Sequence, residues 1–157
     1  MRLTIHVLAT PGPDWADAAC AEYLKRLPKH WKTRVNRLAP ARRRGQANAA
    51  HWQARDSERI RAQLDGRETL ILLDERGRRH DSRGFADRVA HWDDTFAEVA
   101  MIIGGPDGHD DALRGQAQEL VSLSPLTFPH ALARVVLLEQ LYRASTIRAG
   151  HPYHRDG

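Results

Sequence analysis

The residues best suited to bind a ligand lie where an apolar run gives way to glycines. Residues 99–103 have the composition of a buried β-strand and lead directly into Gly104, Gly105 and the turn that ends at Gly108. Glycine has no Cβ, so a ligand can approach the main chain closely there. Ligands of open α/β sheets bind at the carboxyl ends of strands. The alternative is a plain strand-to-helix turn that binds nothing.

Two segments closer to the C-terminus carry side chains suited to acid–base chemistry. Glu139 and Arg143 are four residues apart in a predicted helix, so they share one face, with Tyr142 beside them. The chain then ends in a polar aromatic tail, residues 151–155, that contains two histidines and an arginine. The alternatives are an ordinary intrahelical ion pair and a terminus that frays.

Several chemistries lack the residues that they need. Cys20 is the only cysteine, which excludes an internal disulfide and a cysteine-based zinc cluster, and its alanine-rich surroundings predict a packing role. His151 and His154 have no carboxylate-rich or cysteine partner motif, so we expect no metal. The motifs of dinucleotide enzymes, P-loop NTPases and serine hydrolases are also missing.

The charge distribution favours a polyanionic partner. The net charge is +4, and residues 23–55 contain no Asp or Glu. A surface of one sign attracts nucleic acid through phosphate contacts. The basic residues of this segment are Lys25, Arg26, Lys29, Lys32, Arg34, Arg37, Arg42, Arg43, Arg44 and Arg55.

The elements that must position these residues alternate along the chain, which predicts a three-layer α/β fold with a mainly parallel sheet. Apolar runs predict strands at 3–8, 33–38, 69–74, 96–103 and 121–126. Helices are predicted at 14–27, 46–64, 82–93, 110–120 and 129–147, with Asp14 and Ser82 as N-caps and residues 75–79 as a loop.

The length of 157 residues fits one domain, residues 1–157. No apolar run approaches the roughly 20 residues that cross a bilayer, and the N-terminus has the pattern of a strand, so we expect a cytoplasmic protein.

Four motifs together resemble a known family. Residues 103–108 read Ile-Gly-Gly-Pro-Asp-Gly, and residues 123–130 read Leu-Ser-Pro-Leu-Thr-Phe-Pro-His. Residues 134–143 read Arg-Val-Val-Leu-Leu-Glu-Gln-Leu-Tyr-Arg, and residues 151–155 read His-Pro-Tyr-His-Arg. In this order, over nearly the whole chain, they resemble the RlmH family of bacterial large-subunit rRNA methyltransferases.

The resemblance implies a SPOUT-class enzyme with a trefoil knot in its C-terminal half (an α/β knot) that acts as a homodimer. It further implies S-adenosyl-L-methionine as cofactor, and methylation of N3 of a pseudouridine in 23S rRNA on the assembled 70S ribosome. Carried over by motif, the cofactor-binding residues are Leu73, Gly104, Gly105, Leu123, Ser124, Pro125, Leu126, Thr127 and Phe128. Apolar side chains among them could wall an adenine ring.

The implied reaction is an in-line transfer that needs no covalent intermediate, which fits a sequence without an evident nucleophile. The N3 proton must leave, so we expect a base. The catalytic candidates are His154 as the base, Tyr153, Arg143 and Glu139, and the RNA-binding candidates are Arg42, Arg43, Arg44 and Arg155.

Two other functions stay open. The chain could be a basic ribosome-binding assembly factor that does not transfer methyl groups, although its intact glycines and tail argue against this. It could also be a SPOUT enzyme acting on tRNA, but relatives of that kind usually carry further RNA-binding domains.

Overall fold

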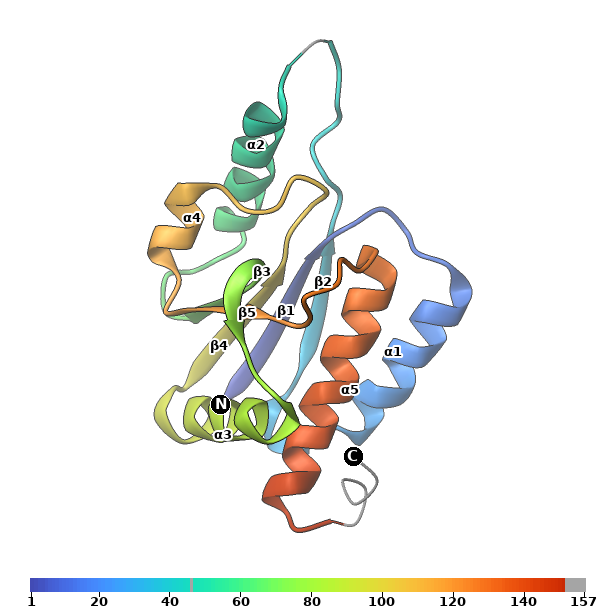
Figure 1. The fold of residues 1–157 in the computed structure, drawn as a ribbon, viewed down its shortest axis with the longest axis vertical. Coiled ribbons are helices and arrows are strands. Elements are labelled where there is room, and N and C mark those ends of the chain that lie inside the picture. Colours follow the sequence, from blue (N-terminus) through green and yellow to red (C-terminus); the bar gives the residue numbers. More distant parts are fainter. Residues whose placement is uncertain (46, 152–157) are drawn as a thin grey trace.

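The centre of the structure, a computed structural model that describes residues 1–45 and 47–151, is a parallel β-sheet (Figure 1). Within the described residues it has five strands in the order β2-β1-β4-β3-β5, and every neighbouring pair is parallel. The strands are β1 (Arg2–Leu8), β2 (Arg34–Leu38), β3 (Thr69–Arg79), β4 (Glu98–Ile103) and β5 (Glu119–Ser122). The predicted parallel α/β sheet is confirmed, and the trefoil knot stays a prediction.

Helices cover both faces of this sheet, which makes three layers. One face packs against α1 (Asp14–Arg26), α3 (Ser82–Thr95) and α5 (His130–Arg148), and the other against α2 (Ala49–Arg61) and α4 (Asp111–Gln116). A short 3-10 helix, η1 (Lys29–Trp31), precedes β2. None of the described helices is both long enough and apolar enough to cross a membrane.

Alternate residues of the central strands supply the two cores. On β4, Val99 and Met101 face the larger core, whereas Ala100 and Ile102 face the smaller one. Both faces are therefore buried, as the continuous apolar run predicts. Cys20 is 5% exposed within the larger core, which confirms its packing role.

The predicted helix starts are wrong by one to three residues, and α4 and α5 begin at Asp111 and His130 rather than at residues 110 and 129. The helix α1 is capped by Pro13 rather than Asp14, and α3 is capped by Asp81, whose Oδ1 accepts from the Gly84 N–H at 2.7 Å. The helix α2 begins at Ala49 because Asn48 Oδ1 accepts from the His51 N–H at 3.0 Å, which closes the first turn.

The last strand is also displaced from its prediction. It spans Glu119–Ser122 rather than 121–126, and α4 ends at Gln116 instead of continuing to Leu120. Residues 119–121 pair with 71–73 of β3, so a contact between distant segments overrides the helical pattern of the local sequence.

The predicted loop at residues 75–79 is part of β3, separated from the rest of the strand by a break in register. Leu73 and Arg78 both pair with Val121, so residues 74–77 form a bulge between them. A Cβ on Gly77 would lie 2.5 Å from the backbone N and C of Val121, so only glycine fits. The bulge brings the end of β3 back onto β5.

We predict that Gly77→Ala lowers the free energy of unfolding by about 1–3 kcal/mol or more, because its methyl group collides with the β5 backbone. A matched control is Gly115→Ala in α4, where a Cβ has no atom within 4 Å. The free energy of unfolding of this control should rise by up to about 1 kcal/mol, since alanine restricts the conformations of the unfolded chain. Urea unfolding measures both, and equal stabilities would contradict this role of Gly77.

Candidate functional site

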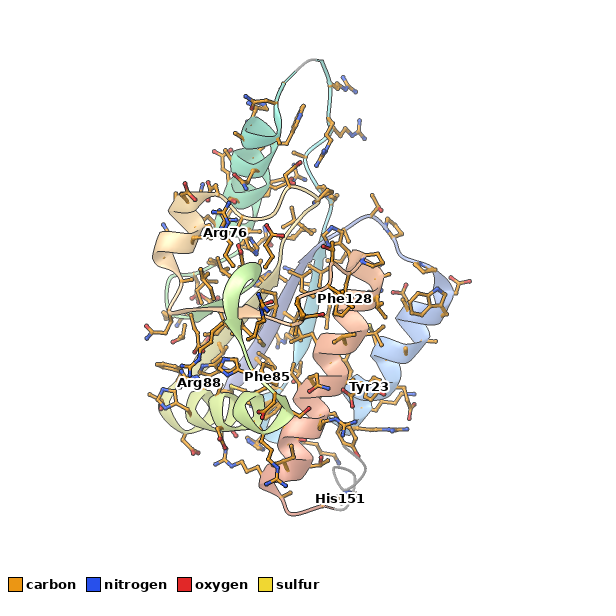
Figure 2. The ribbon with its side chains drawn as sticks, viewed as in Figure 1. Tyr23, Arg76, Phe85, Arg88, Phe128 and His151 are labelled. Carbon is orange, nitrogen blue, oxygen red and sulfur yellow. The ribbon has the colours of Figure 1, made fainter. Side chains whose placement is uncertain are left out.

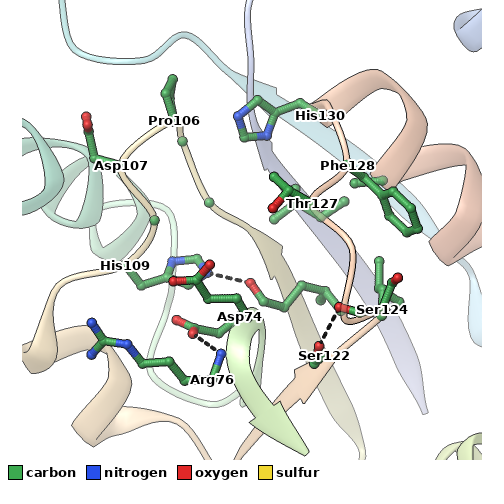
Figure 3. A pocket seen from close by; sticks show the side chains of 18 of the residues that line it. Asp74, Arg76, Pro106, Asp107, His109, Ser122, Ser124, Thr127, Phe128 and His130 are labelled. Carbon is green, nitrogen blue, oxygen red and sulfur yellow. Dashed lines mark hydrogen bonds between the residues drawn. The ribbon is translucent and has the colours of Figure 1, made fainter. Parts of the chain in front are cut away.

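A cavity opens at the carboxyl ends of β3, β4 and β5 (Figure 3). Its volume is about 750 Å³, within the range of small-molecule and cofactor sites. Three segments build it, one after each strand: residues 73–76, 103–109 and 123–130. This is the edge at which parallel α/β sheets bind their ligands.

All nine residues expected to bind the cofactor line this one cavity. Leu73 ends the straight part of β3, Gly104 and Gly105 follow β4, and the other six form the loop after β5. In that loop the Leu126 N–H donates to Ser124 Oγ at 2.9 Å, which fixes a local turn. Leu126 is 72% exposed, so it offers apolar area that a ligand could cover.

Two of the protein's own side chains require the glycines after β4. A Cβ on Gly104 would lie 2.8 Å from Cε1 of His109, and one on Gly105 would lie 2.6 Å from Oδ2 of Asp56. These distances are shorter than any non-bonded carbon contact. Space for a ligand is therefore not the only reason for glycine here, because the turn packs directly on two buried polar groups.

His109 lies beneath the glycine turn and is 1% exposed. Its Nε2 is 3.0 Å from the carbonyl oxygen of Leu73, and because a carbonyl only accepts, Nε2 carries the proton. Its buried Nδ1 has no hydrogen-bond partner among the described residues. Burial lowers the pKa of His109, so the neutral ring holds the end of β3.

The floor beside His109 contains a buried ion pair. Arg114 Nε donates to Asp74 Oδ2 at 2.8 Å, and the two side chains are 13% and 2% exposed. Burial by itself would raise the pKa of Asp74, but hydrogen bonds from the Arg76 N–H and from Arg114 outweigh it and leave that pKa below its usual value. Asp74 therefore stays charged at neutral pH.

A buried carboxylate of α2 joins two loops at the rim. Asp56 is 2% exposed, and its Oδ1 accepts from the Ala41 N–H at 2.6 Å while its Oδ2 faces Gly105. Gln53 Nε2 donates to the Asp107 carbonyl oxygen at 2.9 Å. The sequence predicts α2 as a mostly polar helix and gives no sign of these roles.

The loop with Arg42, Arg43 and Arg44, which the sequence predicts to bind RNA, reaches the rim of the cavity. Arg43 forms an ion pair with Asp107, so its charge is already partnered. Arg42 and Arg44 are exposed and have no ion pair within the described part of the chain. Arg155 lies outside the described residues.

Of the predicted catalytic residues, Glu139 and Arg143 do not lie at the cavity of this chain. On α5, Arg143 donates to Glu139 Oε1 from Nε at 3.0 Å and from Nη2 at 2.8 Å. At about 1.5 Å of rise per residue, Arg143 lies roughly 20 Å along α5 from His130 at the cavity. Neither Arg143 nor Glu139 is among the described residues that line the cavity. Tyr153 and His154 lie outside the described residues.

Within the described residues, no group of three or more His, Cys, Asp or Glu side chains is positioned to hold a metal ion. The cavity instead combines apolar walls, exposed backbone and charged groups at its rim. Such a lining suits a polar organic ligand with an apolar portion.

Comparison with known proteins finds relatives of the same length. The sequence pattern of the family described as "Predicted SPOUT methyltransferase" matches residues 1–154. The chain is 44% identical over 156 residues to "Ribosomal RNA large subunit methyltransferase H" of Verminephrobacter eiseniae, covering 99% of this chain and 100% of the relative. A protein of the same name from Methylibium petroleiphilum is 40% identical with the same coverage.

A solved structure titled "Crystal structure of an hypothetical protein" has a similar fold. It superposes with a TM-score of 0.52 at 12% identity, over 94% of this chain and 81% of its own. At that identity the likeness concerns the fold alone.

We predict that His109 makes stability fall as the pH drops below about 6.5, the usual pKa of histidine in an unfolded chain. Because burial lowers the folded pKa, the unfolded chain takes up more protons in this window, and stability declines until the folded pKa is reached. The pKa values of Asp17, Asp74 and Asp110 are lowered below 3.8, so their contributions are lost only at more acidic pH.

Urea unfolding between pH 5 and 7.5 provides the test. The variant His109→Gln, whose amide can still donate to Leu73, should show a shallower pH dependence than the wild type. His6 and His130, whose pKa values burial also lowers, leave a residual slope. Replacing the exposed His51 by Gln is the control, and a slope unchanged in His109→Gln would contradict the prediction.

Proposed function

The chain belongs to the SPOUT methyltransferase family, and from this premise we propose that it methylates N3 of a pseudouridine in 23S rRNA, on the assembled ribosome, with S-adenosyl-L-methionine as methyl donor. The observation that carries the proposal is the cavity of about 750 Å³ at the carboxyl ends of β3, β4 and β5, built by the three loops that the resemblance assigns to the cofactor. Its full-length relatives are named as rRNA methyltransferases, which supports RNA as the substrate.

The cavity fits S-adenosyl-L-methionine in size and in chemistry. Leu73, Leu126 and Phe128 provide apolar walls for the adenine ring, and Gly104 and Gly105 line the cavity without side chains of their own. The bound cofactor would supply an electrophilic methyl group. The loop residues would hold it at the mouth, where a nucleotide can reach the methyl carbon from solvent.

The remaining chemistry is the removal of one proton. As N3 forms its bond to the methyl carbon, the bond from that carbon to sulfur breaks and the N3 proton must leave. We propose that His154 is the base that accepts the N3 proton, and that Tyr153 assists it. Arg143, oriented by Glu139, then stabilises the developing negative charge or a neighbouring phosphate.

We further propose that the whole chain acts as one knotted SPOUT domain in a cytoplasmic homodimer. The distance along α5 between His130 and Arg143 supports this arrangement, because it separates the cavity from the Glu139–Arg143 pair within one chain. A second protomer can bring its own pair, its basic loop with Arg42, Arg43 and Arg44, and the Arg155 of its tail beside the cavity of the first.

We predict that purified protein transfers label from S-adenosyl-L-methionine to 70S ribosomes and that free rRNA and tRNA accept less. The assay compares these three acceptors under identical conditions. Label on tRNA alone would favour the tRNA-modifying alternative. Ribosome binding without any transfer would favour a non-catalytic assembly factor.

We also predict that Leu126→Ala weakens cofactor binding roughly tenfold or more, because a leucine covered by a ligand contributes about 1.5–3 kcal/mol. The matched control is Leu132→Ala on α5, since Leu132 is 36% exposed and does not line the cavity within the described structure. Isothermal titration of both variants measures the difference. Equal affinities would argue against Leu126 as a cofactor wall.

A further inference from the structure

The end of β3 carries three arginines that the catalytic assignment does not use. We call residues 75–79 the arginine loop, with the sequence Glu-Arg-Gly-Arg-Arg. Arg76, Arg78 and Arg79 are all exposed, and Arg76 and Arg79 line the cavity. Figure 3 shows the Arg76 side chain reaching outward at the cavity edge, and Figure 2 shows where it lies on the whole molecule.

The backbone contacts of the arginine loop fix its position. The Arg76 N–H donates to Asp74 Oδ1 at 2.9 Å, and Asp74 is anchored by the buried Arg114. Gly77 packs against the backbone of Val121, and Arg79 pairs with Ser122 of β5. The backbone of Arg76 and Arg79 is therefore held in place before a ligand binds. This lowers the conformational entropy that is lost on binding.

Three other arginines near the cavity are already paired with carboxylates. Arg43 pairs with Asp107, Arg61 with Asp110, and Arg114 with both Asp74 and Asp111. In contrast, Arg76 and Arg79 form no ion pair within residues 1–45 and 47–151, and neither does Glu75, which precedes Arg76. Of the acidic residues that line the cavity, Asp74 and Asp107 are thus paired with other arginines and Glu75 is not. The guanidinium groups of Arg76 and Arg79 are left to face an outside anion.

We propose that Arg76 and Arg79 bind the RNA phosphates that flank the target nucleotide as it enters the cavity. This inference rests on the proposed function, since it assumes an RNA substrate. Guanidinium groups bind phosphate oxygens through paired hydrogen bonds, and such contacts position a nucleic acid without reading its sequence. The loop thereby sets where the target nucleotide sits relative to the cofactor.

The location favours a phosphate of the RNA over the carboxylate of the cofactor. Both arginines are exposed on the rim, whereas the cofactor loops and their apolar walls surround the interior of the cavity. A nucleotide that enters from solvent must carry its phosphates past this rim. A cofactor held among the three loops does not need an exposed cation there.

The test compares the double variant Arg76→Gln/Arg79→Gln with Arg83→Gln. Arg83 is an equally exposed arginine without an ion pair among the described residues. It lies in the first turn of α3, outside the acid-free segment 23–55, and does not line the cavity of the described structure. Binding to 70S ribosomes is measured by co-sedimentation over a range of salt concentrations. Cofactor affinity is measured by isothermal titration.

We expect the double variant to bind ribosomes at least roughly tenfold more weakly, because two charged hydrogen-bond partners are lost. The slope of log affinity against log salt should fall by about 1–2, given roughly 0.7–0.9 per phosphate contact. Cofactor affinity should not change. The variant Arg76→Lys/Arg79→Lys should keep most of the salt slope, since it keeps the charge, and kcat should vary less than KM for ribosomes.

Two results would overturn the inference. One is equal loss of ribosome binding in Arg83→Gln, which would mean that only net charge matters. The other is weakened cofactor binding with ribosome binding intact, which would assign the arginines to the cofactor carboxylate. Co-sedimentation does not require methyl transfer. A wild type that binds ribosomes but transfers no label would therefore contradict the proposed function, while ribosome binding by the arginine variants would still test this inference.

Discussion

The cavity depends on how closely the backbone of residues 104–105 approaches two buried polar side chains. His109 lies under Gly104 and holds the carbonyl of Leu73, while Asp56 lies under Gly105 and holds the amide of Ala41. Through these contacts the exit of β4 is tied to the end of β3 and to the loop that carries Arg43. Three loops that are distant in sequence thus keep one arrangement before any ligand binds.

Charge pairing divides the arginines around this site into two groups. Arg43, Arg61 and Arg114 are bound to carboxylates, and these contacts hold α2, α4 and the glycine turn against one another. Arg76 and Arg79 are exposed on the rim, on a backbone fixed by Gly77 and Asp74. The first group maintains the shape of the cavity. We propose that the second group binds the phosphates of the RNA.

The sequence was sufficient for the parts of this arrangement that depend on local pattern. The apolar run at 99–103 identifies a central strand because both of its faces are buried, and the glycines after it mark the ligand edge. The roles of His109 and Asp56 depend on contacts with Leu73 and Ala41, which belong to other elements, so no local pattern indicates them. The continuation of β3 through the arginine loop likewise depends on pairing with β5.

A mass-spectrometric map of rRNA modifications decides whether this chain methylates one pseudouridine of 23S rRNA, as we propose. The map compares 23S rRNA from the source strain, from a strain lacking the gene, and from that strain with the gene restored. We expect a single methyl group on a pseudouridine to disappear in the deletion strain and to return with the gene. An unchanged modification map in the deletion strain would contradict the proposal.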